Sequence, residues 1–232
     1  MSDKLVVWDV DGTLVDSRET IFESARESFA FLGEPEPTYD AVRQIVGLGL
    51  KEALGVLMPH RVGADLDRAV DAYRDAFQTW RRPGFIEPLY DGAAETLDRL
   101  RREGWKIAMA TGKSRRGVES VIRMHGWADL FDSTHCADDG PGKPHPAMLL
   151  EAMRALSCGP DRTIMVGDTA HDMRMAKSAG AYAQGVSWGF HTTAEVLAGG
   201  ADHVADDFAS LNRQLDAFSG QLTEHIQPRS SW

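Results

Sequence analysis

Four short polar clusters carry the residue types that could do chemistry, and each follows a run that favours a β-strand. They supply four carboxylates, a lysine, a threonine and two glycines: Asp9, Asp11 and Gly12, then Thr111 and Gly112, then Lys143, and finally Asp168 and Asp172. Carboxylates that lie close together repel one another, and a divalent cation with a lysine relieves that repulsion. Oxygen ligands favour magnesium over zinc, which prefers nitrogen and sulfur. If the clusters meet in space, they can form a Mg²⁺ site.

The other residues of the clusters suit an anion that bears phosphate. Thr111 supplies a hydroxyl donor, and Gly12 and Gly112 let backbone N–H groups approach an anion closely. Lys143 supplies positive charge for oxygens that gain negative charge in a transition state. These parts favour phosphoryl transfer, in which positioning and electrostatics carry most of the catalysis.

Alternating strands and helices must position these clusters. The pattern predicts strands at residues 5–8, 106–110, 131–136, 163–166 and 181–186. It predicts helices at residues 91–103, 114–125, 146–156, 170–179, 192–198 and 207–217. Such alternation implies a parallel sheet covered on both faces, with ligands bound at the carboxyl ends of the strands. We therefore expect an α/β fold with a doubly wound, mainly parallel sheet, in which all four clusters share one edge.

A long helical stretch interrupts this alternation after the first strand. Apolar residues recur at intervals of three and four, as in the run Leu66, Ala69, Val70 and Tyr73, and this spacing is typical of amphipathic helices. Turn signals divide the stretch into several helices. We therefore predict an α/β core formed by residues 1–15 and 85–232, with residues 16–84 inserted as an all-helical cap.

The four clusters, taken together, resemble the motifs of the haloacid dehalogenase superfamily. The resemblance rests on the run from Asp9 to Ser17, on Thr111, on Lys143 and on Gly167-Asp168-x-x-x-Asp172, in the family's order. The helical insert resembles the mobile helical cap of that family, so the resemblance covers nearly the whole chain. It implies a Rossmann-like core and a layout closest to phosphoglycolate-phosphatase-like members.

The resemblance also implies a role for each residue. Asp9 would be the nucleophile that forms an aspartyl-phosphate, and Asp11 would be the general acid and base. The Mg²⁺ ligands would be an Asp9 side-chain oxygen, the Asp11 backbone carbonyl and Asp168, while Asp172 would hydrogen-bond behind them or orient a metal-bound water. The residues that hold the phosphoryl group would be Gly12, Thr111, Gly112 and Lys143.

Three functions remain open at this point. The first is a phosphatase, a phosphoric monoester hydrolase, that acts on a small phosphorylated metabolite such as 2-phosphoglycolate. The second is a sugar-phosphate phosphomutase similar to β-phosphoglucomutase, since those relatives share all four motifs. The third is a non-catalytic phosphate-binding protein on the same scaffold, which would be expected to have a broken motif. Asp11 argues against the dehalogenases of the superfamily, which lack the second aspartate.

Composition and charge restrict the partners. The formal net charge is −10, with 25 Lys and Arg against 35 Asp and Glu, and this disfavours nucleic acid and anionic membranes, which require concentrated positive charge. Two cysteines and the lack of a long apolar run favour a cytoplasmic protein. We expect a small-molecule phosphate ester as substrate and a monomer or homodimer, with Lys51 and Arg43 as possible cap contacts to the substrate.

Overall fold

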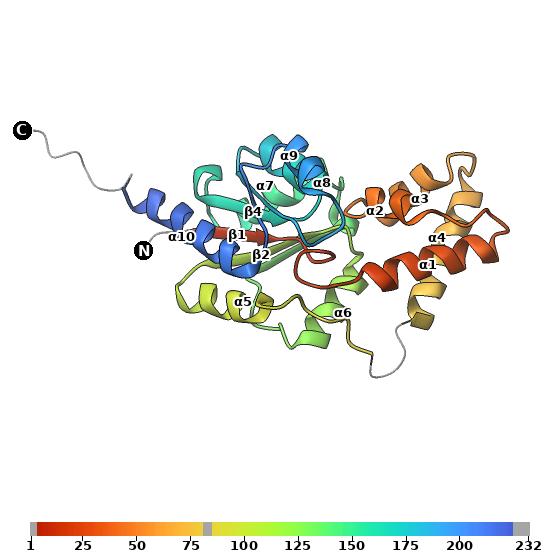
Figure 1. The fold of residues 1–232 in the computed structure, drawn as a ribbon, viewed down its shortest axis with the longest axis horizontal. Helices are drawn as coiled ribbons and strands as arrows, with labels where there is room; N and C mark the ends of the chain where they lie inside the picture. The colour runs from red at the N-terminus through yellow and green to blue at the C-terminus, as the bar shows by residue number, and fades with distance from the viewer. Residues whose placement is uncertain (1–3, 81–84, 225–232) are drawn as a thin grey trace, which may run out of the picture.

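A six-stranded parallel sheet lies at the centre of the larger part of the molecule (Figure 1). The computed structural model describes residues 4–80 and 85–224. The strands are β1 (Leu5–Trp8), β2 (Lys106–Thr111), β3 (Ser133–Cys136), β4 (Thr163–Gly167), β5 (Tyr182–Val186) and β6 (His203–Ala205). Their order is β3-β2-β1-β4-β5-β6, and every neighbouring pair is parallel. The predicted α/β fold class with a parallel sheet is confirmed.

Helices cover both faces of the sheet because the central strand is apolar on both sides. Val6 and Trp8 of β1 face one apolar cluster, and Leu5 and Val7 face the other, since successive strand residues point in opposite directions. The first face packs against α5 (Ala93–Arg102), α6 (Arg115–His125) and α10 (Phe208–Glu224). The second packs against α7 (Ala147–Ala155), α8 (Ala170–Ser178) and α9 (Thr193–Ala198).

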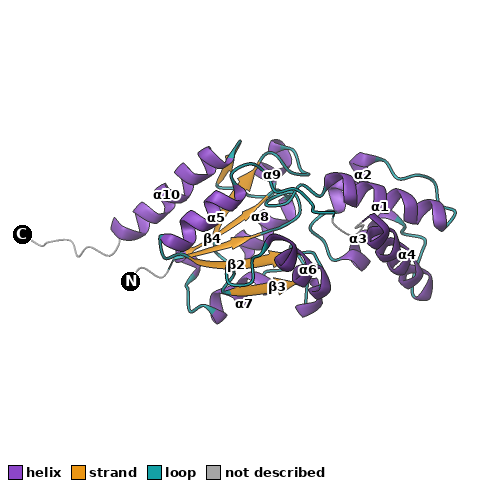
Figure 2. Ribbon diagram, turned by 90° about the horizontal axis from the view of Figure 1, so that it is seen from below, coloured by secondary structure: helices purple, strands orange, loops and turns teal. Residues whose placement is uncertain are grey.

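Four further helices gather beyond one end of the sheet (Figure 2). They are α1 (Arg18–Phe31), α2 (Tyr39–Ile45), α3 (Leu50–Leu57) and α4 (Ala64–Trp80), and we call them the helical unit. Their apolar faces form two small clusters, one around Ile21 and Val42 and one around Phe29 and Leu54. Between residues 16 and 80 the structure is helical, as the spacing predicts. The division of the chain at residues 15/16 and 84/85 stays a prediction, and residues 81–84 lie outside the described residues.

The structure differs from the sequence prediction at the edge of the sheet that β6 forms. The three-residue strand β6 was not predicted, because His203-Val204-Ala205 offers no apolar run. Helix α10 extends to Glu224 instead of ending near residue 217. Pairing with β5 forms β6, and packing against the sheet stabilises the apolar face of α10.

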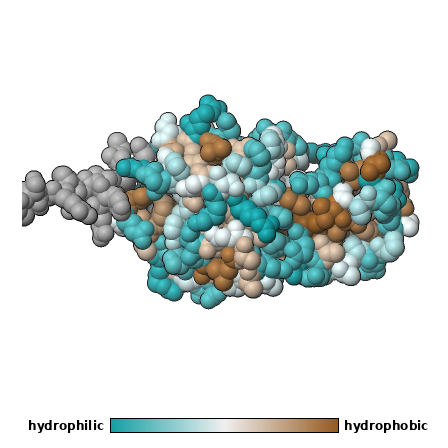
Figure 3. Space-filling view, turned by 90° about the horizontal axis from the view of Figure 1, so that it is seen from above, coloured by the Kyte–Doolittle hydropathy of each residue, from teal (hydrophilic) through white to brown (hydrophobic). Residues whose placement is uncertain are grey.

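The surface seen in Figure 3 is mainly hydrophilic, with apolar side chains in separate patches. This agrees with the enclosure of most large apolar side chains in the clusters on the two sheet faces and inside the helical unit. Within residues 4–80 and 85–224, none of the helices combines the length and the apolar character that crossing a membrane requires.

Candidate active site

The loop after β1 places two aspartates at the carboxyl end of the sheet. Asp9 extends the line of β1, since its backbone N–H donates to the carbonyl of Val166 in β4 at 3.0 Å. Three backbone N–H groups then donate to the carbonyl of Val10, which closes a tight turn. Gly12 has a φ of +81°, and a Cβ there would lie 2.3 Å from Asp168 Oδ2. The turn can therefore pass against Asp168 only with glycine at this position.

Lys143 is fully buried and joins two carboxylates from different parts of the chain. Its Nζ lies 2.7 Å from Asp9 Oδ1 and 2.6 Å from Asp172 Oδ1. Burial alone would lower the pKa of Lys143, but Asp172 and Asp9 outweigh it and hold the pKa above its ordinary value. The lysine therefore stays protonated and keeps a positive charge beside both carboxylates.

Asp168 is also fully buried, and hydrogen bonds hold both of its oxygens. Oδ1 accepts from the Thr13 hydroxyl at 2.9 Å, and Oδ2 accepts from the Phe190 backbone N–H at 2.8 Å. Burial, followed by the negative charges of Asp9 and Asp172, raises the pKa of Asp168 well above its ordinary value in spite of these donors. The carboxylates thus lie in a region that holds too little positive charge for all of them.

The acidic side chains fit a divalent cation. Asp9, Asp168 and Asp172 each offer an oxygen, and these oxygens lie within 4.8 Å of one another. Asp9 Oδ2 is buried and finds no hydrogen-bond partner among the described residues. Burial first, and then Asp172, raise the pKa of Asp9 to about 7 although Lys143 acts to lower it. Lys143 compensates only one of three negative charges, so a hard cation that seeks oxygen ligands, such as Mg²⁺, suits the remainder.

Asp172 differs from Asp9 because the protein engages both of its oxygens, and it differs from Asp168 because one of these oxygens pairs with the ammonium of Lys143. Oδ1 pairs with Lys143, and Oδ2 accepts from the backbone N–H and the hydroxyl of Thr169 at 3.1 and 2.6 Å. The bond from the Thr169 backbone N–H, together with the Asp172 backbone N–H that donates to the Thr169 hydroxyl, forms a capping box at the start of α8. A Cβ at Gly167 would lie 2.4 Å from Asp172 Cγ. This geometry favours Asp172 as a support for the site.

Thr111 and Gly112 lie at the end of β2, beside the two aspartates of the first loop. All four residues line a cavity of about 1390 Å³ between the sheet and the helical unit, together with residues from α2, α3 and α4. A Cβ at Gly112 would lie 2.7 Å from the carbonyl oxygens of Gly47 and Leu48. The loop between α2 and α3 therefore approaches the end of β2 as closely as glycine permits.

The sequence reasoning missed Lys113. Its Nζ lies 2.7 Å from Asp11 Oδ1, and both side chains are mostly buried in the cavity wall. The ammonium also lies 5.8 Å from the centre of the Phe77 ring in α4. Lys113 directly follows Thr111-Gly112, so its position after a predicted strand was a signal that could have identified it.

Arg43 and Lys51, the two cap residues expected to contact the substrate, lie in different surroundings. Lys51 lines the cavity, where its Nζ pairs with Asp67 at 2.6 Å. Arg43 points to the core instead, and its guanidinium pairs with Glu195 at 2.7 Å and with Asp40 at 2.7 Å. Substrate contact by either residue stays a prediction.

Comparison with known proteins agrees with this geometry. A family model described as haloacid dehalogenase-like hydrolase matches residues 4–180. A protein named probable phosphatase IndB, from Dickeya dadantii, is 34% identical over 209 residues, which cover 89% of this chain and 91% of the relative. The phosphoglycolate phosphatase of Vibrio vulnificus is 30% identical, with 90% of this chain and 94% of that protein covered.

A solved structure shows the same likeness in three dimensions. A haloacid dehalogenase-like hydrolase from Bacteroides fragilis superposes with a TM-score of 0.83 at 26% identity, and covers 90% of this chain and 99% of its own. The family match spans strands β1 to β4, the helical unit and all four polar clusters. The chain belongs to the haloacid dehalogenase-like hydrolases.

Proposed function

We propose that this chain is a magnesium-dependent phosphatase that hydrolyses a small phosphorylated metabolite through an aspartyl-phosphate on Asp9. One observation carries the proposal. Asp9 has one oxygen on the buried ammonium of Lys143, while the other is buried without a hydrogen-bond partner in the described residues, in a residue that lines the cavity. A carboxylate held in this way is fixed in orientation and keeps a lone pair for attack.

The first chemical step would transfer the phosphoryl group to Asp9. An Asp9 oxygen attacks phosphorus, and the bond between phosphorus and the ester oxygen breaks. Asp11 gives its proton to the leaving oxygen, which departs as an alcohol. Lys143, the Thr111 hydroxyl and backbone N–H groups near Gly12 and Gly112 would stabilise the phosphoryl oxygens as they gain charge.

The second step would restore the enzyme. Asp11, now a carboxylate, takes a proton from a water molecule, and the water oxygen attacks phosphorus. The bond between phosphorus and Asp9 breaks, and inorganic phosphate leaves. Lys113 pairs with Asp11 and would keep its carboxyl group directed into the cavity through both proton transfers.

Asp9, Asp168 and the Asp11 backbone carbonyl would hold Mg²⁺, with support from Asp172, and the bound ion would supply positive charge that draws the phosphate to the nucleophile. The surplus of buried negative charge around Asp9 supports this part of the proposal. Lys143 alone cannot balance it.

2-Phosphoglycolate is our first candidate substrate, because several relatives carry the name phosphoglycolate phosphatase. Its carboxylate would need a cation near the phosphate, and Lys113 provides one in the cavity wall. Phosphomutase chemistry is the alternative, since it would use the same motifs. A non-catalytic phosphate-binding role is not favoured, because every motif residue is present and the polar groups meet at one site.

Substitution Asp9→Asn should remove turnover and leave the fold intact. Loss of the nucleophile should lower kcat by at least about 10³-fold, because covalent catalysis divides one difficult step into two easier ones. Phosphate release measures the activity, and circular dichroism melting measures the fold. Asp65→Asn, at an exposed position of α4, is the matched control. Activity of Asp9→Asn near that of the control would exclude Asp9 as nucleophile.

Substitution Asp11→Ala should lower kcat by about 10²–10⁴-fold on an alkyl phosphate, which needs a protonated leaving oxygen. The loss in the first step should be smaller on p-nitrophenyl phosphate, since nitrophenolate leaves without a proton. Single-turnover rates with both substrates measure this step. Equal losses on the two substrates would show that Asp11 does not protonate the leaving group.

Removal of divalent cations with EDTA should silence the enzyme, and added Mg²⁺ should restore it. Mg²⁺ should also raise the melting temperature of the wild-type protein, because a ligand that binds only the folded state stabilises it. Asp168→Asn should lose most of that rise. Full activity in EDTA would remove the metal from the mechanism.

A panel of phosphorylated metabolites that includes 2-phosphoglycolate and hexose 1-phosphates should separate the candidate functions. We expect release of inorganic phosphate, measured beside the formation of isomerised sugar phosphate. Isomerisation that is faster than phosphate release would replace the phosphatase proposal with the phosphomutase alternative.

A further inference from the structure

The backbone of the segment between β5 and α9 lies directly against Asp168. Phe190 donates its N–H to Asp168 Oδ2 at 2.8 Å. A Cβ at the preceding residue, Gly189, would lie 2.2 Å from that same oxygen, so the backbone here has almost no space to shift toward the carboxylate. We call residues 189–191 the Phe190 segment. Its position fixes one oxygen of a residue that we assign to the metal site.

The side chain of Phe190 belongs to a different part of the molecule. Its ring is buried and packs in the apolar cluster of the helical unit, which contains Ile21 and Ala25 of α1 and Val42 of α2. The ring also lies against the loop after β1, since a Cβ at Gly12 would come within 2.6 Å of Phe190 Cδ2. One residue therefore inserts its ring into the helical unit while its backbone holds Asp168.

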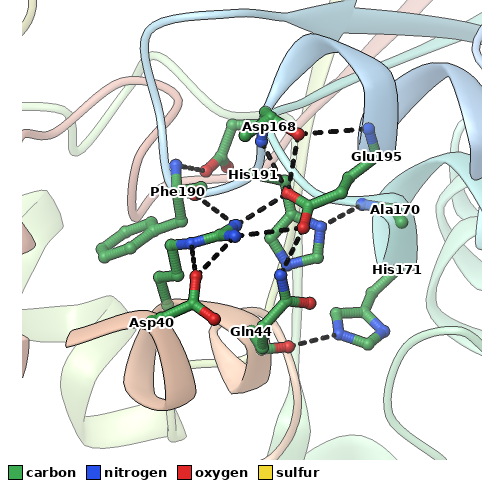
Figure 4. A network of polar contacts seen from close by, with 10 residues as sticks. Asp40, Gln44, Asp168, Ala170, His171, Phe190, His191 and Glu195 are labelled. Carbon is green, nitrogen blue, oxygen red and sulfur yellow. Dashed lines mark hydrogen bonds and ion pairs between the residues drawn. The ribbon is translucent and has the colours of Figure 1, made fainter. Parts of the chain in front are cut away.

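Polar contacts join the same two parts beside the ring (Figure 4). Arg43 and Gln44 of α2 both donate to the carboxylate of Glu195, at 2.7 Å and 2.5 Å for the shortest contacts. Arg43 Nη1 also lies 3.4 Å from the Phe190 carbonyl oxygen, which it approaches as a donor. Glu195 is itself held in a capping box with Thr192 at the start of α9, so the partner of Arg43 is fixed to the core.

A second set of contacts reaches the first residues of α8, next to Asp172, from the same side. The carbonyl oxygen of Gln44 accepts a hydrogen bond from His171 Nε2 at 3.1 Å, and His171 immediately precedes Asp172 in α8. His191, in the Phe190 segment, accepts from the Ala170 backbone N–H through Nδ1 at 3.1 Å. The end of α2 therefore contacts the core beside Asp168, as Figure 4 shows, and at His171, the residue before Asp172.

We propose that Phe190 is a positioning residue through which docking of the helical unit onto the core fixes Asp168 for Mg²⁺, and that the Arg43–Glu195 pair holds the docked arrangement. The inference rests on the proposed function because it assigns Mg²⁺ to Asp168. When the helical unit moves away, the Phe190 ring leaves its apolar cluster and the segment loses that anchor. By linkage, docking strengthens Mg²⁺ binding, and Mg²⁺ favours docking by the same factor.

Mg²⁺ titration by calorimetry tests the first half of this linkage without any turnover. Phe190→Ala and Arg43→Met should each weaken Mg²⁺ binding by at least about five-fold, the lower end of coupling between protein sites. Phe190→Leu keeps an apolar anchor and should recover most of the affinity. Arg101→Met is the matched control, because it removes an ion pair of similar length, 2.6 Å to Asp132, on the core alone.

Distances between spin labels test the second half. Labels at Val56→Cys in α3 and Leu150→Cys in α7 use exposed positions on the two parts, and the natural cysteines Cys136 and Cys158 are buried. Mg²⁺ should narrow and shorten the distance distribution in the otherwise unchanged protein. It should have little effect in the presence of Phe190→Ala, and its effect should return with Phe190→Leu.

The outcomes separate the two proposals. If the wild-type protein binds Mg²⁺ and Phe190→Ala and Arg43→Met bind it equally well, the positioning role is wrong and the proposed function stands. Altered label distances with unchanged Mg²⁺ affinity also overturn it, since docking would then be independent of Asp168. A wild-type protein that binds no Mg²⁺ overturns both. Melting curves of each variant check the fold, and Arg43→Met and Phe190→Leu keep the test decisive if Phe190→Ala does not fold.

Discussion

The fully buried ammonium of Lys143 is the interaction on which the rest of the site depends. It pairs with Asp9 after β1 and with Asp172 at the start of α8, and thus ties together three segments that are far apart in the sequence. Removal of charges from water costs several kcal/mol for each ion, so three buried carboxylates need compensation. Lys143 supplies part of it, and the negative charge that it leaves uncompensated suits a divalent cation.

The apolar strands allowed most of this core to be predicted from sequence. A strand buried on both faces is a run of apolar residues, as in Leu5 to Trp8, and four of the five predicted strands precede a polar cluster. Parallel pairing then brings these ends together whatever their separation in sequence. The edge strand β6 was not predictable in this way, because its three residues acquire strand conformation from β5, and the length of α10 depends on its packing against the sheet.

The contacts between the helical unit and the core could not be predicted from local patterns. Arg43 and Glu195 lie about 150 residues apart and look like ordinary charges on helices, since nothing in their neighbourhoods indicates a partner. Phe190 looks like any apolar residue in a loop, and only the fold shows its ring in the cluster of Ile21 and Val42. A sequence pattern predicts that an apolar residue is buried. Only the three-dimensional fold shows which of the apolar clusters that residue joins.

The strength of these contacts is consistent with an assembly that separates and re-forms. A partly exposed ion pair such as Arg43–Glu195 contributes roughly 0–1 kcal/mol, and complete burial of one aromatic side chain contributes about 1.5–3 kcal/mol. Their sum is small beside the roughly 5–15 kcal/mol that separates a typical folded domain from its unfolded state. In the proposed linkage, the helical unit would leave the core without unfolding it, whereas Lys143, with no exposed surface, would stay with the sheet. Under this proposal the buried charge network would keep its geometry while the weak, partly exposed contact opens, so that the site would admit water after it has excluded it.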